Sequence, residues 1–257
     1  QMAKLLADSL EYQKNKGNFL SLDKKMLLAD YEQLMRRSEN WRHVINPKTG
    51  WADGRHQNRK WENNLDLVHR KSYITEGATC HYTWYVPQNV EGLFQVINNS
   101  GQNVITRLDR MFDEGLYWHG NEPCHQIAYL YNKAGAPWKT QQRIHHILNT
   151  EYNDTPGGLS GNDDAGQMSA WYMFSAIGFY PVCPATPYYY IGTPSFDKVT
   201  FNLENGRKFE IVAEGVDDEN FYIQQVDLNG KSGYFLSHDD LLKGGKLSFR
   251  MGNTPKY

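Results

Sequence analysis

The chain has 257 residues, of which 40% are hydrophobic and 22% are charged, so it can bury a substantial core in one or two globular domains. Its formal net charge of −2 leaves no basic surface for nucleic acid, and its apolar runs are too short to span a membrane. We therefore expect neither a nucleic-acid partner nor a membrane span. Seven Trp and 17 Tyr offer flat faces that suit sugar rings, although an aromatic-rich core explains them equally well.

Helical patterns fill the first two thirds of the chain, which starts with Gln1 and no signal peptide, as expected of a part of a longer or processed protein. Leu5, Leu6 and Leu10 keep one face of a first helix apolar. Ser21 is the predicted N-cap of a second helix. The apolar stripe of that helix comprises Leu27, Leu28, Tyr31, Leu34 and Met35 and continues to Trp41 and Val44. Turn residues at 46–50 end it, and residues 51–72 read as a long polar loop.

Five further helices are predicted, near residues 88–98, 101–113, 122–134, 138–151 and 165–178. No strand pattern separates them, which favours a helical bundle or toroid over alternating βαβ units. Beyond Pro181 short segments alternate apolar and polar residues, and Asn205-Gly206 and Asn229-Gly230 between them predict hairpin turns. We therefore predict a mixed α and β chain, with a helical domain over residues 1–187 and an antiparallel β domain over residues 188–257.

Three loops carry polar residues that a helical core does not need. They are residues 73–84 with Glu76, residues 118–123 with Asn121 and Glu122, and residues 157–166 with Asn162, Asp163 and Asp164. Acidic residues before a helix often only cap its free N–H groups, and for any one loop that is the simpler explanation. Three such loops beside Gly and aromatic residues favour a site, because Asn and Glu oxygens suit calcium and paired carboxylates serve glycoside hydrolysis.

Histidines near these loops raise the alternative of a zinc site. His119 and His125 are not spaced as an i, i+4 pair, no HExxH motif occurs, and the adjacent His145 and His146 cannot share a helix face. The cysteines are too few and too scattered for a CxxC site or a disulfide framework; they are Cys80, Cys124 and Cys183. The spacing therefore argues against zinc.

One long block dominates the third loop and the helix after it: Gly161-Asn-Asp-Asp-Ala-Gly-Gln-Met-Ser-Ala-Trp-Tyr-Met-Phe-Ser-Ala-Ile-Gly-Phe-Tyr-Pro181. Shorter blocks accompany it at Thr75–Gly77, Tyr82–Pro87, Gly120–Pro123, Tyr129–Asn132 and Ala134–Gln141. With these blocks the chain resembles glycoside hydrolase family 92, the calcium-dependent exo-α-mannosidases. The similarity runs, with gaps, from about Ala7 to Gly230.

The resemblance implies the later helices of an (α/α)6-type catalytic toroid, followed by appended β structure that is sandwich-like. It implies mannose-containing glycans as substrates, Ca²⁺ as cofactor, inversion at the anomeric carbon, and a secreted, periplasmic or cell-surface location. It also implies that the N-terminal part of the same protein, with a β-sandwich domain and the first toroid helices, is a partner that forms one wall of the pocket.

The resemblance further assigns roles to single residues. Glu76 matches the general acid, and Asp164, with Asp163 as the alternate, matches the general base. The candidates for calcium ligands are Asn121, Glu122, Gln126 and Asn162, and those for substrate contacts are His119, Asn121, Glu122 and Trp84.

The chain departs from the family beside the acid, where the family often reads Asn-x-Trp-Gln-Tyr-Thr-Trp and this sequence reads Ala78-Thr-Cys-His-Tyr-Thr-Trp84. We expect a changed leaving-group subsite there, with simple packing as the alternative. Two other functions stay open: a carbohydrate-binding remnant without catalysis, and a toroid glycosidase of another specificity, such as a trehalase-like enzyme. The carboxylates that are present argue against the first, and the Gly-Asn-Asp-Asp block argues against the second.

Overall fold

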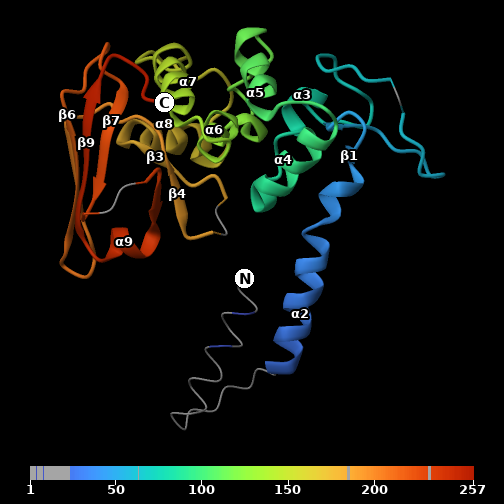
Figure 1. The fold of residues 1–257 in the computed structure, drawn as a ribbon, viewed down its shortest axis with the longest axis horizontal. Helices are drawn as coiled ribbons and strands as arrows, with labels where there is room; N and C mark the ends of the chain where they lie inside the picture. The colour runs from blue at the N-terminus through green and yellow to red at the C-terminus, as the bar shows by residue number, and fades with distance from the viewer. Residues whose placement is uncertain (1–3, 5–7, 9–23, 63, 184–185, 231–232) are drawn as a thin grey trace.

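The computed structural model describes residues 4, 8, 24–62, 64–183, 186–230 and 233–257 (Figure 1). The helix predicted from Leu5, Leu6 and Leu10 and the N-cap predicted at Ser21 lie outside the described residues. The helices up to residue 177 are α2 (Lys24–Arg37), α3 (Thr79–Tyr82), α4 (Val90–Asn99), α5 (Val104–Asp113), α6 (Leu130–Lys133), α7 (Pro137–Thr150) and α8 (Gln167–Ile177). Short 3-10 turns lie between them: η1 (Asn40–His43), η2 (Pro87–Asn89), η3 (Glu122–Cys124), η4 (Ile127–Tyr129) and η5 (Asp164–Gly166).

Four of the five predicted helices are confirmed as α4, α5, α7 and α8. The fifth, near residues 122–134, is wrong as one helix, because the chain there folds as η3, η4 and α6. The Gln126 side chain explains the break: its amide Nε2 donates to the carbonyl of Pro123 at 2.9 Å. In a continuous helix that carbonyl would accept the backbone N–H of Ile127.

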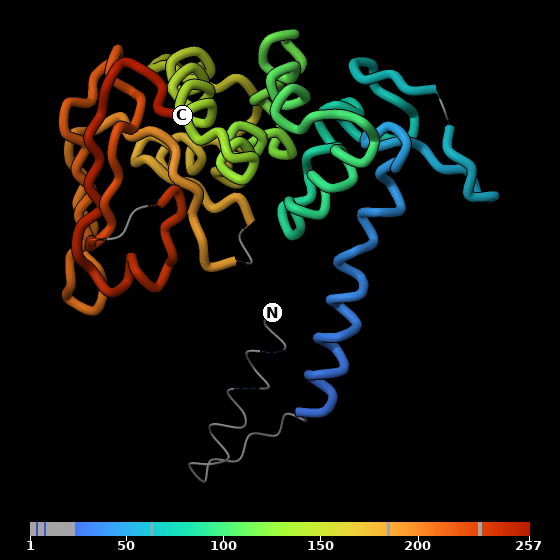
Figure 2. Tube along the Cα trace, in the orientation of Figure 1, coloured from blue at the N-terminus to red at the C-terminus, as the bar shows by residue number. Residues whose placement is uncertain are grey.

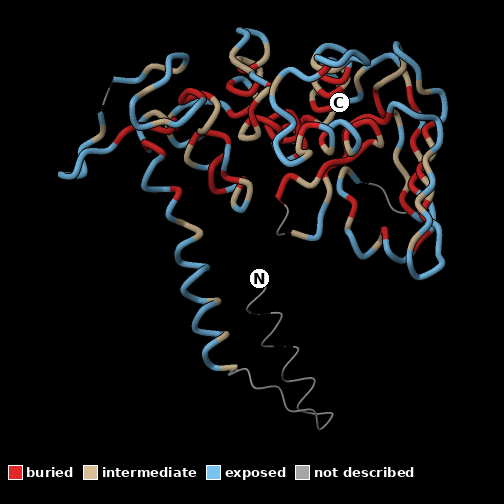
Figure 3. The backbone as a smooth tube through the Cα atoms, turned by 180° about the vertical axis from the view of Figure 1, so that it is seen from behind, coloured by how far each residue is buried: buried red, intermediate tan, exposed pale blue. Residues whose placement is uncertain are grey.

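The predicted second helix is confirmed as α2, but it ends at Arg37 rather than continuing to Val44, and Trp41 lies in η1. The apolar stripe of α2 is not covered by the described residues. The helix projects from the body of the molecule and buries none of its residues (Figure 3). Leu34 and Met35 are 53% and 46% exposed. Among the described helices, none combines the length and the apolar character that crossing a bilayer requires.

The remaining helices pack around one aromatic and aliphatic core. Trp84, Tyr129, Tyr131 and Trp171 are fully buried in it. The ends of these helices follow ordinary capping chemistry, since the Asn103 side chain accepts the N–H of Thr106 at 3.0 Å at the start of α5. Gly178, with φ 113°, ends α8 in the left-handed conformation that glycine adopts readily.

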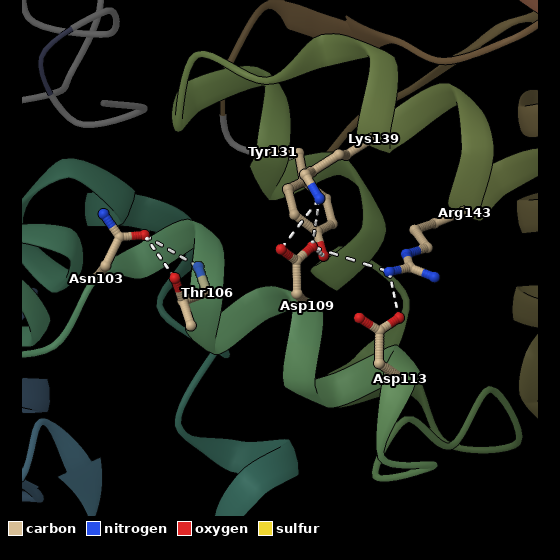
Figure 4. Close-up of polar contacts among 7 residues, drawn as sticks. All are labelled: Asn103, Thr106, Asp109, Asp113, Tyr131, Lys139 and Arg143. Atoms are coloured by element: carbon tan, nitrogen blue, oxygen red, sulfur yellow. Dashed lines mark hydrogen bonds and ion pairs between the residues drawn. The ribbon is translucent and has the colours of Figure 1, made fainter. Parts of the chain in front are cut away.

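Helices α5 and α7 are tied together by a polar cluster away from the three loops (Figure 4). The Asp109 carboxylate accepts hydrogen bonds from the Tyr131 hydroxyl at 2.9 Å and from Lys139 Nζ at 2.9 and 3.0 Å. Arg143 lies 3.8 Å from Asp109 and 2.6 Å from Asp113. The Asp109 and Lys139 side chains are only 24% and 25% exposed, so solvent screens this pair less than an ordinary surface pair.

We predict that Asp109→Asn lowers the free energy of unfolding by about 1–3 kcal/mol, because it leaves Lys139 and Arg143 half-buried without their shared carboxylate. Chemical denaturation measures this loss. The control is Glu114→Gln, which removes the exposed ion pair with Arg110 and should cost less than about 1 kcal/mol. Equal losses in the two variants would contradict the prediction.

The β part contains two sheets that share a core. The strands are β3 (Phe179–Tyr180), β4 (Tyr188–Ile191), β5 (Lys198–Asn202), β6 (Lys208–Glu214), β7 (Tyr222–Leu228), β8 (Phe235–Ser237) and β9 (Gly245–Gly252), with the short helix α9 (His238–Leu242) after β8. One sheet has the order β3-β4-β8 and the other β5-β6-β9-β7. Phe179, Ile191 and Leu236 of the first sheet share a hydrophobic cluster with Phe209 and Leu247 of the second. Near the start of the chain, β1 (Ile45–Asn46) and β2 (Trp51–Ala52) form a small separate hairpin around the predicted turn at 46–50.

Two details of the predicted β domain are wrong. The sheets are not purely antiparallel, because β6 and β9 pair in parallel, with Ile211 opposite Leu247. The Asn205-Gly206 hairpin is confirmed between β5 and β6. Asn229-Gly230 does turn, with φ values of 49° and 86°, but it does not close a hairpin, because β7 pairs with β9 while β8 crosses to β4. The domain division after residue 187 stays a prediction, as does the (α/α)6 toroid.

Buried polar contacts hold the helical and β parts together. Gln141 on α7 is 1% exposed, and its Oε1 accepts the N–H of Ile223 in β7 at 2.9 Å. The Asn132 amide donates to the carbonyl of Ile191 in β4 at 2.7 Å. The C-terminus returns to the helices beside α7 (Figure 2), where the Tyr257 ring lies 4.9 Å from that of Trp138. The helical and β parts are therefore joined through α6 and α7.

Candidate active site

The second and third polar loops meet backbone to backbone. A Cβ on Gly120 would lie 2.5 Å from the Ser160 carbonyl oxygen, and one on Gly161 would collide with the carbonyl oxygen of Gly120. Only glycine allows this approach. The glycines therefore bring the loop of Asn121 and Glu122 against the loop of Asp163 and Asp164.

His81 fastens the first loop to Leu116, which lies just before the second loop. The His81 Nε2–H donates to the Leu116 carbonyl at 2.8 Å, while its Nδ1 accepts the N–H of Ala78 at 3.0 Å. His81 stands at the third position of helix α3, where Gln or Glu commonly makes the same backward bond in a capping box. Cys80 beside it is 1% exposed. The three positions that depart from the family, Ala78, Cys80 and His81, are thus buried or engaged in capping, which favours the packing alternative over a changed subsite.

Glu76, the predicted general acid, lies just before this capped turn and is exposed. Its φ of 64° places a residue with a side chain in the left-handed region. Such backbone strain costs about 1–3 kcal/mol and is concentrated at functional sites. The neighbouring Gly77 is buried, and a Cβ there would lie 2.8 Å from His81 Nδ1, so the backbone around Glu76 is tightly constrained.

The two candidate bases of the third loop have different environments. The Asp163 carboxylate accepts the Ser169 N–H at 2.9 Å and the Ser169 hydroxyl at 2.7 Å. The Ser169 N–H, followed by its hydroxyl, lowers the pKa of Asp163. Asp164 is exposed, and its carboxylate makes no hydrogen bond or ion pair with the part of the chain that the structure describes, although its backbone carbonyl accepts the N–H of Gln167. Asp163 therefore caps α8, while Asp164 has its lone pairs free to accept from water.

A cavity of about 330 Å³ opens beside these loops. Its polar lining residues are Tyr85, Glu122, Gln126, Gln167 and Tyr180. Glu122 and Gln126 were predicted from the sequence. Gln167, Tyr85 and Tyr180 were not, although Gln167 directly follows the Gly-Asn-Asp-Asp loop and so had a sequence signal.

Two of the four predicted calcium ligands, Glu122 and Gln126, line this cavity, and Asn121 and Asn162 do not. Asn121 is 4% exposed and its amide nitrogen has no partner among the described residues, and Asn162 is exposed. Within the described ranges no three His, Cys, Asp or Glu side chains converge on one point. A cation in this cavity would therefore rely on Glu122 and on amide oxygens, the hard donors that calcium accepts. In kind, this donor set fits calcium.

His119, predicted to contact substrate, is buried in a directed chain of hydrogen bonds. The Tyr152 hydroxyl donates to the Met168 carbonyl at 3.1 Å, so its oxygen accepts the His119 Nε2–H at 2.6 Å. The Tyr117 hydroxyl then donates to His119 Nδ1 at 2.7 Å. Both ring nitrogens are thus occupied, and the ring is held neutral. Substrate contact by His119 stays a prediction.

Trp84, the other predicted aromatic contact, is fully buried. Its indole Nε1 has no hydrogen-bond partner within the described residues, and its carbonyl accepts from Gln126 Nε2 at 3.3 Å. Trp84 thus lies behind Gln126 rather than in the lining of the cavity. Its substrate contact also stays a prediction.

Acidification should destabilise this fold, because His119 and His125 must remain neutral in it. Burial lowers the pKa of His119 to about 3 and that of His125 to about 4, from an ordinary value of 6.5. The unfolded chain takes up these protons below about pH 6.5, and the folded chain does so only near the lowered values. The free energy of unfolding should therefore fall by on the order of 5 kcal/mol as the pH drops through this window.

Urea unfolding at a series of pH values between 7 and 4 measures this loss. His119→Gln removes one of the two groups and should make the dependence on pH shallower. His43→Gln, at an exposed position, should leave it unchanged. Identical pH slopes for the wild type and His119→Gln would contradict the role given to this ring.

Comparison with known proteins identifies the family. The model of the glycosyl hydrolase family 92 catalytic domain matches residues 2–253. The structure of a family GH92 alpha-mannosidase from Bacteroides thetaiotaomicron matches with a TM-score of 0.84 at 41% identity, over 91% of this chain and 33% of its own. A family GH92 inverting mannosidase from Bacteroides thetaiotaomicron VPI-5482 matches with a TM-score of 0.80 at 33% identity, over 95% of this chain and 35% of its own.

A curated relative, an uncharacterized secreted glycosidase of Arthroderma benhamiae, is 27% identical over 256 residues, covering 89% of this chain and 33% of its own length. The chain thus spans about a third of the length of the relatives that it matches. The resemblance found in the loops is confirmed: the chain belongs to glycosyl hydrolase family 92.

Proposed function

We propose that the polypeptide containing this chain is an exo-α-mannosidase that removes terminal α-linked mannose from glycans with inversion at the anomeric carbon. The observation that carries the proposal is the backbone contact between the second and third loops at Gly120 and Gly161, with the first loop hydrogen-bonded through His81 to Leu116 just before the second loop. The mannosidase names of its structural neighbours support the choice of sugar.

In this proposal Glu76 gives its proton to the glycosidic oxygen, so that the sugar–oxygen bond breaks and the rest of the glycan leaves as an alcohol. Asp164 takes a proton from the water that attacks the anomeric carbon from the opposite face. Asp163 holds the start of α8 through Ser169 and so fixes the loop that presents Asp164.

Calcium is proposed as the cofactor, with Glu122 and Gln126 as the residues of the predicted set that would hold it. The ion would bind sugar hydroxyls and help to distort the ring toward the transition state. Glu122 supplies the negative charge, and Gln126 is held in place by Pro123 and Trp84 through its amide nitrogen.

A secreted or cell-surface location is proposed as well, supported by the curated relative that is named as secreted. The N-terminal part of the same protein is the proposed partner of this chain. Its contribution would be one wall of the pocket, next to the exposed Glu76 and Asp164.

Hydrolysis of an aryl α-mannoside by the complete natural polypeptide, with calcium and then with a chelator, tests the proposal. We expect turnover that the chelator abolishes and calcium restores, and no turnover of the matching α-glucoside. Turnover of the α-glucoside alone would point to a glycosidase of another specificity. Binding of mannose without turnover of any glycoside would point to a carbohydrate-binding remnant.

A further inference from the structure

The cavity beside Glu122 contains two glutamine side chains from different parts of the chain. Gln126 lies between η3 and η4, and Gln167 is the first residue of α8. A glutamine amide offers a donor at one end and an acceptor at the other, and which end faces a cavity depends on the bonds behind it. The surrounding hydrogen bonds decide this for both residues.

For Gln126 the neighbours are two backbone carbonyls. The amide Nε2 lies 2.9 Å from the Pro123 oxygen and 3.3 Å from the Trp84 oxygen. Carbonyl oxygens only accept, so the NH₂ group must face them. The amide oxygen of Gln126 is therefore left for the other side, where the residue lines the cavity.

For Gln167 the orientation follows from His125. His125 Nε2 lies 3.0 Å from the carbonyl oxygen of His119, so this nitrogen carries the proton. In the neutral ring Nδ1 is then an acceptor, and it lies 3.3 Å from Gln167 Nε2. The second N–H of the same amide donates to the Tyr180 hydroxyl at 3.0 Å. Both amide hydrogens of Gln167 are used, and its oxygen has no hydrogen-bond partner within the described ranges.

We infer that Gln167 is a further cation ligand of this cavity, presenting its amide oxygen together with the amide oxygen of Gln126 and the carboxylate of Glu122, and that His125 is the residue that positions it. This inference rests on the proposed function and extends its ligand set by a residue that the loop carboxylates did not reveal. The ligand is an oxygen-preferring divalent cation, which takes six to eight oxygens in proteins, with water or sugar hydroxyls completing the shell.

His125 positions Gln167 through one of its two ring nitrogens, Nδ1. His125 is 1% exposed, and its own carbonyl accepts the Trp171 indole N–H at 2.9 Å, so the backbone on which the ring is mounted is also held. A side chain without an acceptor at the Nδ1 position would release the Gln167 amide to rotate. The NH₂ group could then face the cavity and repel a cation.

Binding of Ca²⁺ to the complete natural polypeptide tests the inference without reference to turnover. Terbium luminescence sensitised by Tyr85 and Tyr180, competed away by Ca²⁺, reports occupancy of this cavity. We expect Gln167→Leu to weaken cation binding by about tenfold or more, in the range seen when ligand-supporting groups are removed. Gln167→Glu, which keeps an oxygen, should bind at least as tightly as the wild type, and Gln142→Leu, at an exposed position on α7, should be unchanged.

His125 is tested by a matched pair of variants. His125→Leu removes the acceptor and should weaken cation binding, whereas His125→Asn places an amide oxygen near the former Nδ1 and should restore most of it. Wild-type affinity in Gln167→Leu, or no competition by Ca²⁺ in the wild type, would overturn the inference. Mannoside hydrolysis measured on the same samples separates the two proposals. If the wild type hydrolyses the mannoside and Gln167→Leu binds the cation as tightly as the wild type, this inference alone is wrong. If Gln167→Leu binds the cation more weakly but the wild type hydrolyses no mannoside, the proposed function alone is wrong.

Discussion

Replacing Glu76 by Gln should reduce hydrolysis of a natural α-mannoside by about 10³-fold or more, while leaving the fold intact. The glutamine amide cannot donate a proton to the leaving oxygen, and general acid catalysis of this kind contributes about 10²–10⁴-fold. The carboxyl of Glu76 is exposed and its backbone is constrained by Gly77 and His81, so the change removes chemistry and no packing. Steady-state kinetics on a mannobiose measures the loss.

The dependence on the leaving group makes this test specific for a general acid. An aryl α-mannoside whose phenol leaves without protonation should be far less impaired by Glu76→Gln than a mannobiose. An equal loss on both substrates would assign Glu76 to binding, and full activity on the mannobiose would exclude it from catalysis.

The sequence predicted best those elements whose stability is local. Helices α4 and α5 carry their own Asn caps, and the Asn205-Gly206 turn joins neighbours in sequence, so pattern and structure agree there. The turn at Asn229-Gly230 has the expected backbone but the wrong partner, because β9 returns from beyond α9 to pair with β7. That choice depends on side chains such as Phe249 reaching a core built by both sheets, which no local pattern records.

In the candidate site too, features set by local sequence were predictable and features set by distant contacts were not. The Gly-rich loops that carry Glu122, Asp163 and Asp164 were predictable, because their residue types have few structural uses in that combination. Gln167 was not, because the direction of its amide is set through His125 by a backbone carbonyl far away in sequence. His119 is a second case: no local pattern records that Tyr117 and Tyr152 occupy its two ring nitrogens in the interior, and the substrate contact that the resemblance implies for it stays a prediction.

Asp164→Asn should abolish turnover, by about 10³-fold or more, without lowering the free energy of unfolding, because its carboxylate has no partner among the described residues to lose. Asp163→Asn should instead weaken the cap on α8 and cost about 1 kcal/mol of stability. Activity and chemical denaturation measured on both variants therefore distinguish the general base from the residue that supports it.

Chemical rescue sharpens this assignment, because an anion such as azide attacks the anomeric carbon without needing a base to deprotonate it. Asp164→Ala should regain turnover in azide and release a mannosyl azide of inverted configuration, whereas Asp163→Ala should not respond. The reverse result would make Asp163 the base, and the Ser169 contacts, which lower the pKa of Asp163, would then serve to keep that base ionised. The expected outcome ties Asp164 to water activation and Asp163 to holding α8, whereas the reverse outcome gives both tasks to Asp163.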